Sequence, residues 1–184
     1  MPRQAILLRG INLGVANRLS MPELRKVLTA EGFSDVATYM QSGNILLSYP
    51  DGRVAPGQLA AEFKRLLAER FELSVPILVL TCEQLATAVR DNPFADLADR
   101  DPKHFLVTFL SQEPDASAVE ELSAFAAEAD DEFAASGQAL YSWHPGGIHL
   151  SKLAVRLTDK RLGVEVATAR NWTTVTTLLE MANA

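Results

Sequence analysis

Two successive stretches of this 184-residue sequence carry the same order of secondary-structure signals. In the first stretch, a short apolar run at residues 4–9 precedes a helical pattern, a pair of strand patterns, a second helical pattern and an apolar run that ends at Leu80. Alternation with a period of two predicts strands, and a period near 3.6 predicts helices. The order strand, helix, hairpin, helix, strand is typical of a βαββαβ unit, in which helices cover one face of an antiparallel sheet.

The second stretch repeats this order after residue 103. Its hairpin contains Ser136-Gly137, and the first hairpin contains the same pair at Ser42-Gly43, which suits a tight turn. We expect its elements at residues 104–110, 116–129, 132–135, 138–143, 151–162 and 165–168, followed by a helix at 173–181. The sequence therefore predicts an α+β fold of two ferredoxin-like subdomains, each an antiparallel sheet with helices packed on one face.

The boundary between the subdomains is predicted from two prolines. Pro93 and Pro102 flank a segment without a strong periodic pattern, so residues 94–102 are the predicted linker. We expect residues 1–93 to form the first ferredoxin-like subdomain. Residues 103–184 are then the second, with an extra C-terminal helix.

The clearest local signal is the start of the first helix. Ser20 suits the N-cap position, and Glu23 follows it three residues later, as in a capping box. Leu19 and Leu24 have the spacing of a hydrophobic staple, and Gly32 marks the end of the helix.

The charge is unevenly distributed. The net charge is −6, and residues 101–184 hold 6 basic and 12 acidic side chains, so the acidic excess lies in the second half. Much of it falls in residues 115–132, which we expect to form the solvated face of a helix. Because phosphate contacts require clustered Lys and Arg, the composition disfavours a nucleic-acid partner.

The remaining composition is that of a globular protein, with 48% hydrophobic residues. No apolar run approaches the roughly 20 residues that span a bilayer, and no secretory leader is recognisable. Cys82 is the only cysteine, so an intrachain disulfide is excluded. We expect a cytoplasmic protein without a membrane partner, and the sequence leaves a monomer and a homodimer open.

The loop at residues 9–18 is one candidate binding site. Its Gly and Asn residues lie between a strand and a helix start, where free backbone N–H groups can bind an anion. Arg9 and Arg18 could add charged hydrogen bonds, and Asn12 and Asn17 neutral ones. The alternative is that these residues only shape the turns of the loop.

The segment at residues 168–173 is the second candidate. Arg170 could grip a phosphate or carboxylate, and Trp172 could stack on a planar group. The alternative interpretation places Trp172 in the core, pairs Arg170 with an acid and uses Asn171 as a helix cap. Lys152, after Ser151, is a further candidate for the ligand, although a capping Ser beside an exposed Lys explains that pair equally well.

Signals for catalysis and metal binding are weak. His144 and His149 lie five residues apart on a Gly-rich turn but lack a third ligand nearby, so we predict no metal site. No Ser-His-Asp or paired-carboxylate arrangement is visible in the spacing, and no cofactor motif is present. The catalytic residues, if any, stay unknown at this level.

Several motifs together resemble a known family. They are LLRGINLG at residues 7–14, MPEL at 21–24, TYMQSGN at 38–44, NPF at 92–94, SK at 151–152 and TARNWTTV at 168–175. In this order they resemble the bacterial domain-of-unknown-function family 1697, and the resemblance implies two ferredoxin-like subdomains. Many members carry a Gly and a Lys where this chain has Val15-Ala16, so a Lys that could touch an anion is absent here. The family supplies no activity.

The leading functional hypothesis is the binding of a small anionic or nucleotide-like ligand between the two subdomains. It expects Arg9 or Arg18 to lie near Arg170, since Arg and Asn gather beside a helix start in both segments. One alternative is an enzyme that acts on a phosphorylated small molecule. Another is an RNA-binding or protein-interaction module, because ferredoxin-like sheets serve many functions.

Overall fold

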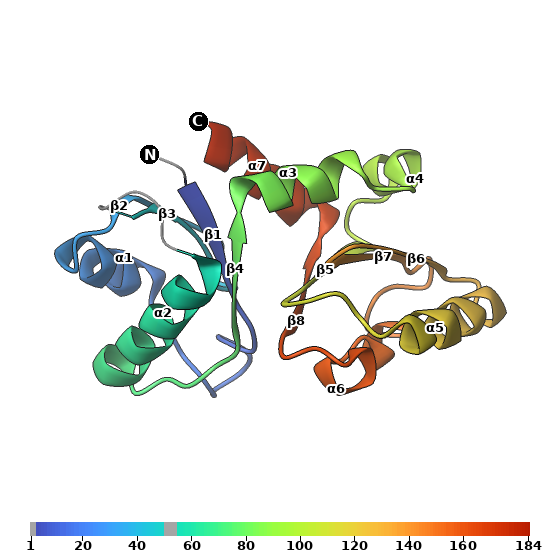
Figure 1. Cartoon of the computed structure of the whole chain (residues 1–184), viewed down its shortest axis with the longest axis horizontal. Helices are drawn as coiled ribbons and strands as arrows, with labels where there is room; N and C mark the ends of the chain where they lie inside the picture. Colours follow the sequence, from blue (N-terminus) through green and yellow to red (C-terminus); the bar gives the residue numbers. More distant parts are fainter. Residues whose placement is uncertain (1–2, 50–54) are drawn as a thin grey trace. The chain divides into compact units, whose positions relative to one another are not determined.

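The computed structural model describes residues 3–49 and 55–184. They form two four-stranded antiparallel sheets, one in each of two compact units (Figure 1). The first unit comprises the residues up to Ala86 together with Thr177–Ala184, and the second comprises Thr87–Thr176.

The first unit has the order of elements that the sequence predicts. They are β1 (Arg3–Leu8), α1 (Met21–Ala30), β2 (Ser34–Tyr39), β3 (Asn44–Ser48), α2 (Pro56–Phe71) and β4 (Ile77–Thr81). The strands lie side by side in the order β2-β3-β1-β4, with β1 between β3 and β4. This antiparallel order with two crossing helices is the ferredoxin-like arrangement.

The core of the first unit lies between its sheet and its two helices. Ile6 and Leu8 lie two residues apart on β1, so they share one face of the sheet. α1 and α2 both cover that face (Figure 1). Leu24 and Leu28 face them from α1, and Phe63 faces them from α2; all five side chains are buried. The Ser20 hydroxyl accepts a hydrogen bond from the Glu23 N–H at 3.4 Å, so Ser20 caps α1 as predicted.

The second unit repeats this plan. Its elements are α4 (Ala95–Arg100), β5 (Phe105–Leu110), α5 (Ala116–Glu128), β6 (Glu132–Ser136), β7 (Ala139–Trp143), the 3-10 turn η1 (Ala154–Arg156), α6 (Asp159–Leu162) and β8 (Ala167–Asn171). The strand order β6-β7-β5-β8 matches that of the first unit, so the fold is two ferredoxin-like subdomains. The two hairpins, β2–β3 and β6–β7, hold the same place in that order.

The two compact units are divided within helices, and the domain boundaries expected from the prolines stay a prediction. The segment expected to be a linker contains α4, and the first division of the chain falls between Ala86 and Thr87. That point lies inside α3 (Cys82–Arg90), and the second division lies inside α7 (Trp172–Asn183). α3 and α7 therefore each contribute residues to both units.

The predicted helix at residues 151–162 is wrong. Only η1 and the four-residue α6 form there, because Thr158 is extended and interrupts the helical backbone. Val155 is 71% exposed, so the apolar residues of this segment do not make the continuous stripe that stabilises a surface helix. Leu153 and Leu162 anchor the segment to the core at its two ends instead.

No helix within residues 3–49 and 55–184 has both the length and the apolar character needed to cross a lipid bilayer.

Candidate functional site

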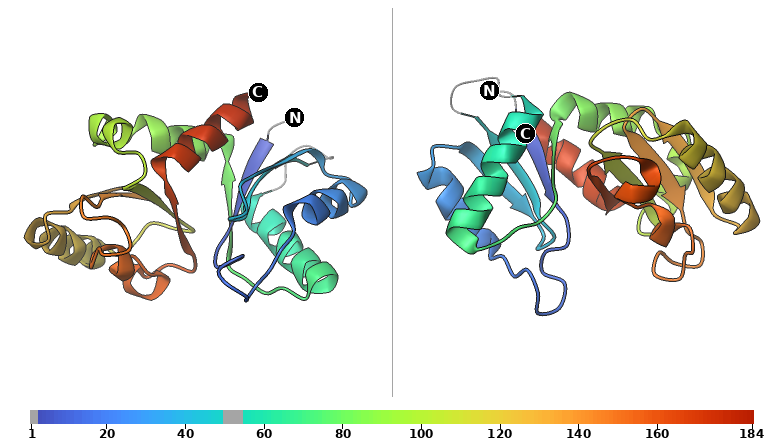
Figure 2. Two further views of the ribbon diagram at one scale, coloured as in Figure 1. Left: turned by 180° about the vertical axis from the view of Figure 1, so that it is seen from behind. Right: turned by 60° about the horizontal axis from the view of Figure 1, so that its bottom comes forward.

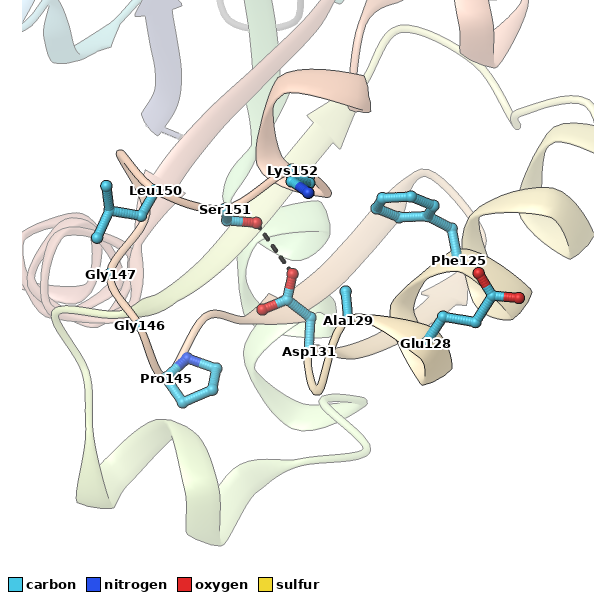
Figure 3. A pocket seen from close by; sticks show the side chains of 10 residues that line it. All are labelled: Phe125, Glu128, Ala129, Asp131, Pro145, Gly146, Gly147, Leu150, Ser151 and Lys152. Carbon is cyan, nitrogen blue, oxygen red and sulfur yellow. Dashed lines mark hydrogen bonds between the residues drawn. The ribbon is translucent and has the colours of Figure 1, made fainter.

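A pocket of about 430 Å³ lies within the second unit, beside the C-terminal end of α5 (Figure 3). Its wall combines apolar side chains, carboxylates, an ammonium, a hydroxyl and two glycines, from Phe125, Glu128, Ala129, Asp131, Pro145, Gly146, Gly147, Leu150, Ser151 and Lys152. We call it the Asp131 pocket. Its volume is within the range of roughly 300–1,000 Å³ that is usual for small-molecule sites.

The pocket lies at the connection in which the second unit departs from the first. In the first unit β3 leads to β4 through the 16-residue α2, which buries Phe63 and three Leu side chains. In the second unit β7 leads to β8 through a segment whose only helical parts are the 3-10 turn η1 and the four-residue α6. Near its start this segment contains Pro145, Gly146 and Gly147. Gly147 has a φ of 96°, outside the helical region, so no helix continues through this segment.

Asp131 is the polar residue at the centre of the pocket. It follows α5 in the turn before β6, and its side chain is only 8% exposed. Its Oδ2 accepts a hydrogen bond of 3.0 Å from the Ser151 hydroxyl, and Figure 3 shows the carboxylate directed toward that residue. Across the residues that the structure describes, no hydrogen bond reaches its other oxygen, Oδ1. A carboxylate that is nearly buried and half satisfied is a strong acceptor for a ligand donor.

His144 lies behind Asp131 in the core of the unit and is fully buried. Its Nε2 is 2.9 Å from the Ser142 hydroxyl, and its Nδ1 is 3.5 Å from Asp131 Oδ2. Nδ1 makes no hydrogen bond within the described residues. The tautomer with the proton on Nδ1 places an N–H toward the carboxylate, so this electrostatic contact favours it.

Burial decides the charge of His144. Loss of hydration lowers the pKa of His144 below its usual value of 6.5, and the neighbouring Asp131 opposes that change only in part. The imidazole is therefore neutral at neutral pH. Because it carries no charge there, it does not neutralise Asp131, and the carboxylate keeps its attraction for a positive ligand.

The chain Ser142–His144–Asp131 resembles a catalytic triad in its connectivity but not in its exposure. Ser142 is fully buried, so a substrate in the pocket does not reach its hydroxyl. Ser151 does line the pocket, but its oxygen accepts hydrogen bonds from the N–H groups of Leu153 and Ala154 while it donates to Asp131. This hydroxyl caps a turn, and the group that accepts its proton is the carboxylate of Asp131 rather than an imidazole. The geometry favours binding over acyl transfer.

The loop at residues 9–18 uses its amides internally. The Asn12 side chain donates to the carbonyls of Leu19 and Gln41 and accepts from the Leu19 N–H. Asn17 donates to the Gly10 carbonyl at 3.0 Å. Both residues have positive φ, as the turn interpretation expects. Arg9 is half-buried and Arg18 is exposed. A ligand role for the four residues stays a prediction.

The segment at residues 168–173 is also bonded within the second unit. Trp172 is buried, its ring packs against Phe105, and its indole N–H donates to Asp99. The Asn171 side chain caps α7 by accepting from the Thr174 N–H. Arg170 donates to the Thr168 hydroxyl and the Ala169 carbonyl, and burial lowers its pKa to about 10. The buried position of Trp172 and the cap at Asn171 match the structural alternative. Anion binding by Arg170 and its pairing with an acid both stay predictions.

The predicted contact of Arg9 or Arg18 with Arg170 joins residues of different units, and it too stays a prediction. Of the predicted ligand residues, only Lys152 lines the Asp131 pocket. Elsewhere in the described part of the chain, no three His, Cys, Asp or Glu side chains gather around a possible metal ion.

Sequence reasoning missed Asp131 as a pocket residue and His144 as the buried group behind it. Asp131 was assigned to the solvated acidic run, in which it is the one nearly buried member. A signal for His144 was present in the strand alternation, because Leu140, Ser142 and His144 share one face. Two polar residues on the face that also carries a core Leu indicate a buried polar cluster.

Comparison with known proteins agrees with the fold. The family model described as "Protein of unknown function (DUF1697)" matches residues 1–141. A solved structure, the conserved bacterial protein SP0830 from Streptococcus pneumoniae, is similar with a TM-score of 0.67 and 23% sequence identity, covering 98% of both chains. At that identity the likeness shows the fold alone. No curated protein matches the sequence. Because the family model covers most of the chain, as the sequence motifs indicated, this protein belongs to the DUF1697 family, for which no function is established.

Proposed function

We propose that this protein binds a small molecule in the Asp131 pocket of its second unit. The observation that carries the proposal is the Asp131 carboxylate, 8% exposed, which lines the pocket with Oδ1 free of hydrogen bonds from the described residues. A buried charge of this kind is costly unless it is paired. A ligand that donates to Oδ1 would remove part of that cost.

The apolar part of the wall supports the same proposal. Leu150 lines the pocket and is 70% exposed, and Phe125 lines it from α5. The guanidinium of Arg156 lies 4.0 Å from the centroid of the Phe125 ring, which holds the ring in place. A ligand that covers both side chains removes apolar surface from water. The pocket thus combines an apolar wall with a few polar groups, as small-molecule sites do.

The anion site expected at residues 9–18 and at Arg170 is a second, weaker candidate. Its amide groups, on Asn12 and Asn17, are held by bonds within the protein. An enzymatic role has less support, because Ser142 is buried and Ser151 caps a turn. RNA binding has less support too, because the acidic second half repels phosphate.

The test is a fragment screen followed by ligand-observed NMR on three proteins. Gly146 lines the pocket, and a Cβ there would meet nothing within 4 Å. A side chain at this position begins in open space on the pocket wall, so we expect Gly146→Phe to obstruct the pocket. Gly57 in α2 is equally open and lies in the other unit, so Gly57→Phe is the matched control.

We expect fragments that bind the wild type to bind Gly57→Phe equally and to lose binding to Gly146→Phe. Both variants should melt within a few degrees of the wild type, since an added Cβ meets no atom within 4 Å at either position. Fragments that bind all three proteins alike would contradict the proposal. A screen that finds no binder at millimolar concentration would contradict it as well.

A further inference from the structure

The charged groups that line the Asp131 pocket indicate which class of ligand it binds. This inference rests on the proposed function, the binding of a small molecule in that pocket. Two carboxylates, Glu128 and Asp131, line the pocket against one ammonium, Lys152. His144, directly behind Asp131, is fully buried. A concave site lined mainly by one sign of charge concentrates ligands of the other sign.

We infer that the ligand carries a primary ammonium group beside an apolar chain, as a free amino acid or the N-terminus of a peptide does. The ammonium donates to Asp131 Oδ1. The apolar chain lies against Phe125 and Leu150. An ammonium offers three donors and a full charge, so it satisfies a half-paired carboxylate better than a neutral hydroxyl does.

The neighbours of Asp131 fix where that donor must come from. Ser151 already donates to Oδ2, and the imidazole of His144 lies 3.5 Å from the same oxygen. Both protein groups thus approach Oδ2, which leaves Oδ1 as the oxygen available to a ligand. Side chains of the described residues supply no further cation to it, and Lys152 makes no ion pair with Asp131.

Lys152 gives the pocket a place for a second ligand group. It is exposed and lies next to Ser151, on the wall that faces Glu128 and Phe125 in Figure 3. A carboxylate attached near the ammonium of the ligand can approach Lys152, as in a free amino acid. A lone anion has no such advantage, because Asp131 and Glu128 repel it.

The probes separate these groups. We would titrate the uniformly ¹⁵N-labelled full chain with isopentylamine, leucine, leucylglycine, 4-methylpentanoate and inorganic phosphate, and follow the amide signals of Gly146 and Gly147. The three amines should shift these signals in a saturable way. The 4-methylpentanoate anion has the same apolar chain without the ammonium, and it should bind at least tenfold more weakly, as should phosphate.

Asp131→Asn keeps the shape and an acceptor for Ser151 but removes the charge. It should weaken binding of isopentylamine by about 10- to 100-fold, the scale of a charged hydrogen bond. Asp130 is exposed and does not line the pocket, so Asp130→Asn is the matched control and should leave the affinity unchanged. Glu128→Gln, at an exposed residue, should cost about 2- to 5-fold.

The comparison of leucine with leucylglycine also shows whether the ammonium belongs to a free amino acid or to the N-terminus of a peptide. Tighter binding of leucine than of leucylglycine, with the difference lost in Lys152→Met, assigns the site to free amino acids. The reverse order assigns it to peptide N-termini. Equal binding of 4-methylpentanoate and isopentylamine would overturn the inference, as would full amine binding by Asp131→Asn. If the fragments lost in Gly146→Phe carry no amine, the pocket stands and only the ligand class is wrong.

Discussion

The two units share one strand order but differ in what covers the sheet. In the first unit α1 and α2 lie over the sheet and close an apolar core around Phe63. In the second unit α5 has irregular chain and the short α6 beside it (Figure 2). Ser142 and His144 are fully buried there. The same fold is thus built once with a complete helix layer over the sheet and once with a pocket in that layer beside the buried His144.

The presence of a full second helix in only one unit indicates where a binding site can arise in a repeated fold. A complete second helix fills the helix layer with side chains, as α2 does with Leu59 and Phe63. Replacing that helix with turns costs apolar burial but leaves room for a pocket, and Ser142 and His144 stay buried behind it. Because the strands keep their pairing, the sheet still holds Ser142 and His144 in fixed positions. We therefore expect the first unit to contribute stability and the second to contribute binding.

The largest expected effect is a contrast between two Phe→Ala substitutions. Phe63 is fully buried in the first unit, so Phe63→Ala should lower the free energy of unfolding by about 3–5 kcal/mol. Phe125 is half-buried on the pocket wall, so Phe125→Ala should cost less than about 2 kcal/mol. Urea denaturation measures both. Equal losses would mean that the pocket wall is as tightly packed as the first core.

The turn glycines of the two hairpins make a second contrast. Gly43 has a φ of 77°, and an added Cβ would lie 2.6 Å from the Cβ of Leu8. Gly137 has a φ of 54°, but its added Cβ would meet nothing within 4 Å. Gly43→Ala should therefore cost about 2–4 kcal/mol, from backbone strain and overpacking together. Gly137→Ala should cost about 1–2 kcal/mol from backbone strain alone. Thermal unfolding of both variants ranks them, and a larger loss for Gly137→Ala would contradict the packing described.

Lowering the pH should reduce the stability of the protein, because His144 in the second unit is buried in its neutral form. The folded-state pKa of His144 is lowered below 6.5, so the unfolded chain binds the proton more readily than the folded one. The stability is full above about pH 6.5 and falls as the pH drops from there toward the folded-state pKa. The charges that act on His144 are Asp131 and His104. In melting curves between pH 7.5 and 5, His144→Gln should lose less stability than the wild type does. Identical slopes would show that His144 takes up its proton as readily in the folded chain as in the unfolded one.

The smallest effect is expected at the cap of α1. The Ser20 hydroxyl accepts from Glu23 at 3.4 Å, a long bond, so Ser20→Ala should cost about 0.5–1 kcal/mol. Ser20 lies in the first unit, so fragment binding at the Asp131 pocket should be unchanged. A loss of binding with normal melting would place the ligand near α1 instead.

Local chemistry was enough to predict most of the fold. The cap at Ser20 and the alternation at Ile6 and Leu8 are properties of short segments, and the structure has both. The repeated order of elements then fixed the ferredoxin-like arrangement. The helix expected from Ser151 onward failed because the apolar residues there serve two separate anchors, Leu153 and Leu162. That distinction depends on the tertiary packing.

The pocket could not be predicted from spacing. Asp131 and His144 meet because the β6–β7 hairpin folds the chain back, and Ser151 reaches them from a turn after β7. The Arg and Asn residues at 9–18 and 168–173 drew attention because their side chains are typical of ligand sites. In these two segments Asn12 holds its loop together, Asn171 caps α7 and Trp172 lies in the core.

The most direct measurement is a map of backbone amide shifts across the whole chain upon addition of a fragment that binds the wild type. We predict that saturable shifts cluster at Phe125, Asp131, Gly146, Gly147 and Ser151, while the strands and loops of the first unit stay unchanged. Shifts that concentrate in the loop at residues 9–18, with Gly146 and Gly147 unaffected, would contradict the assignment of binding to the second unit.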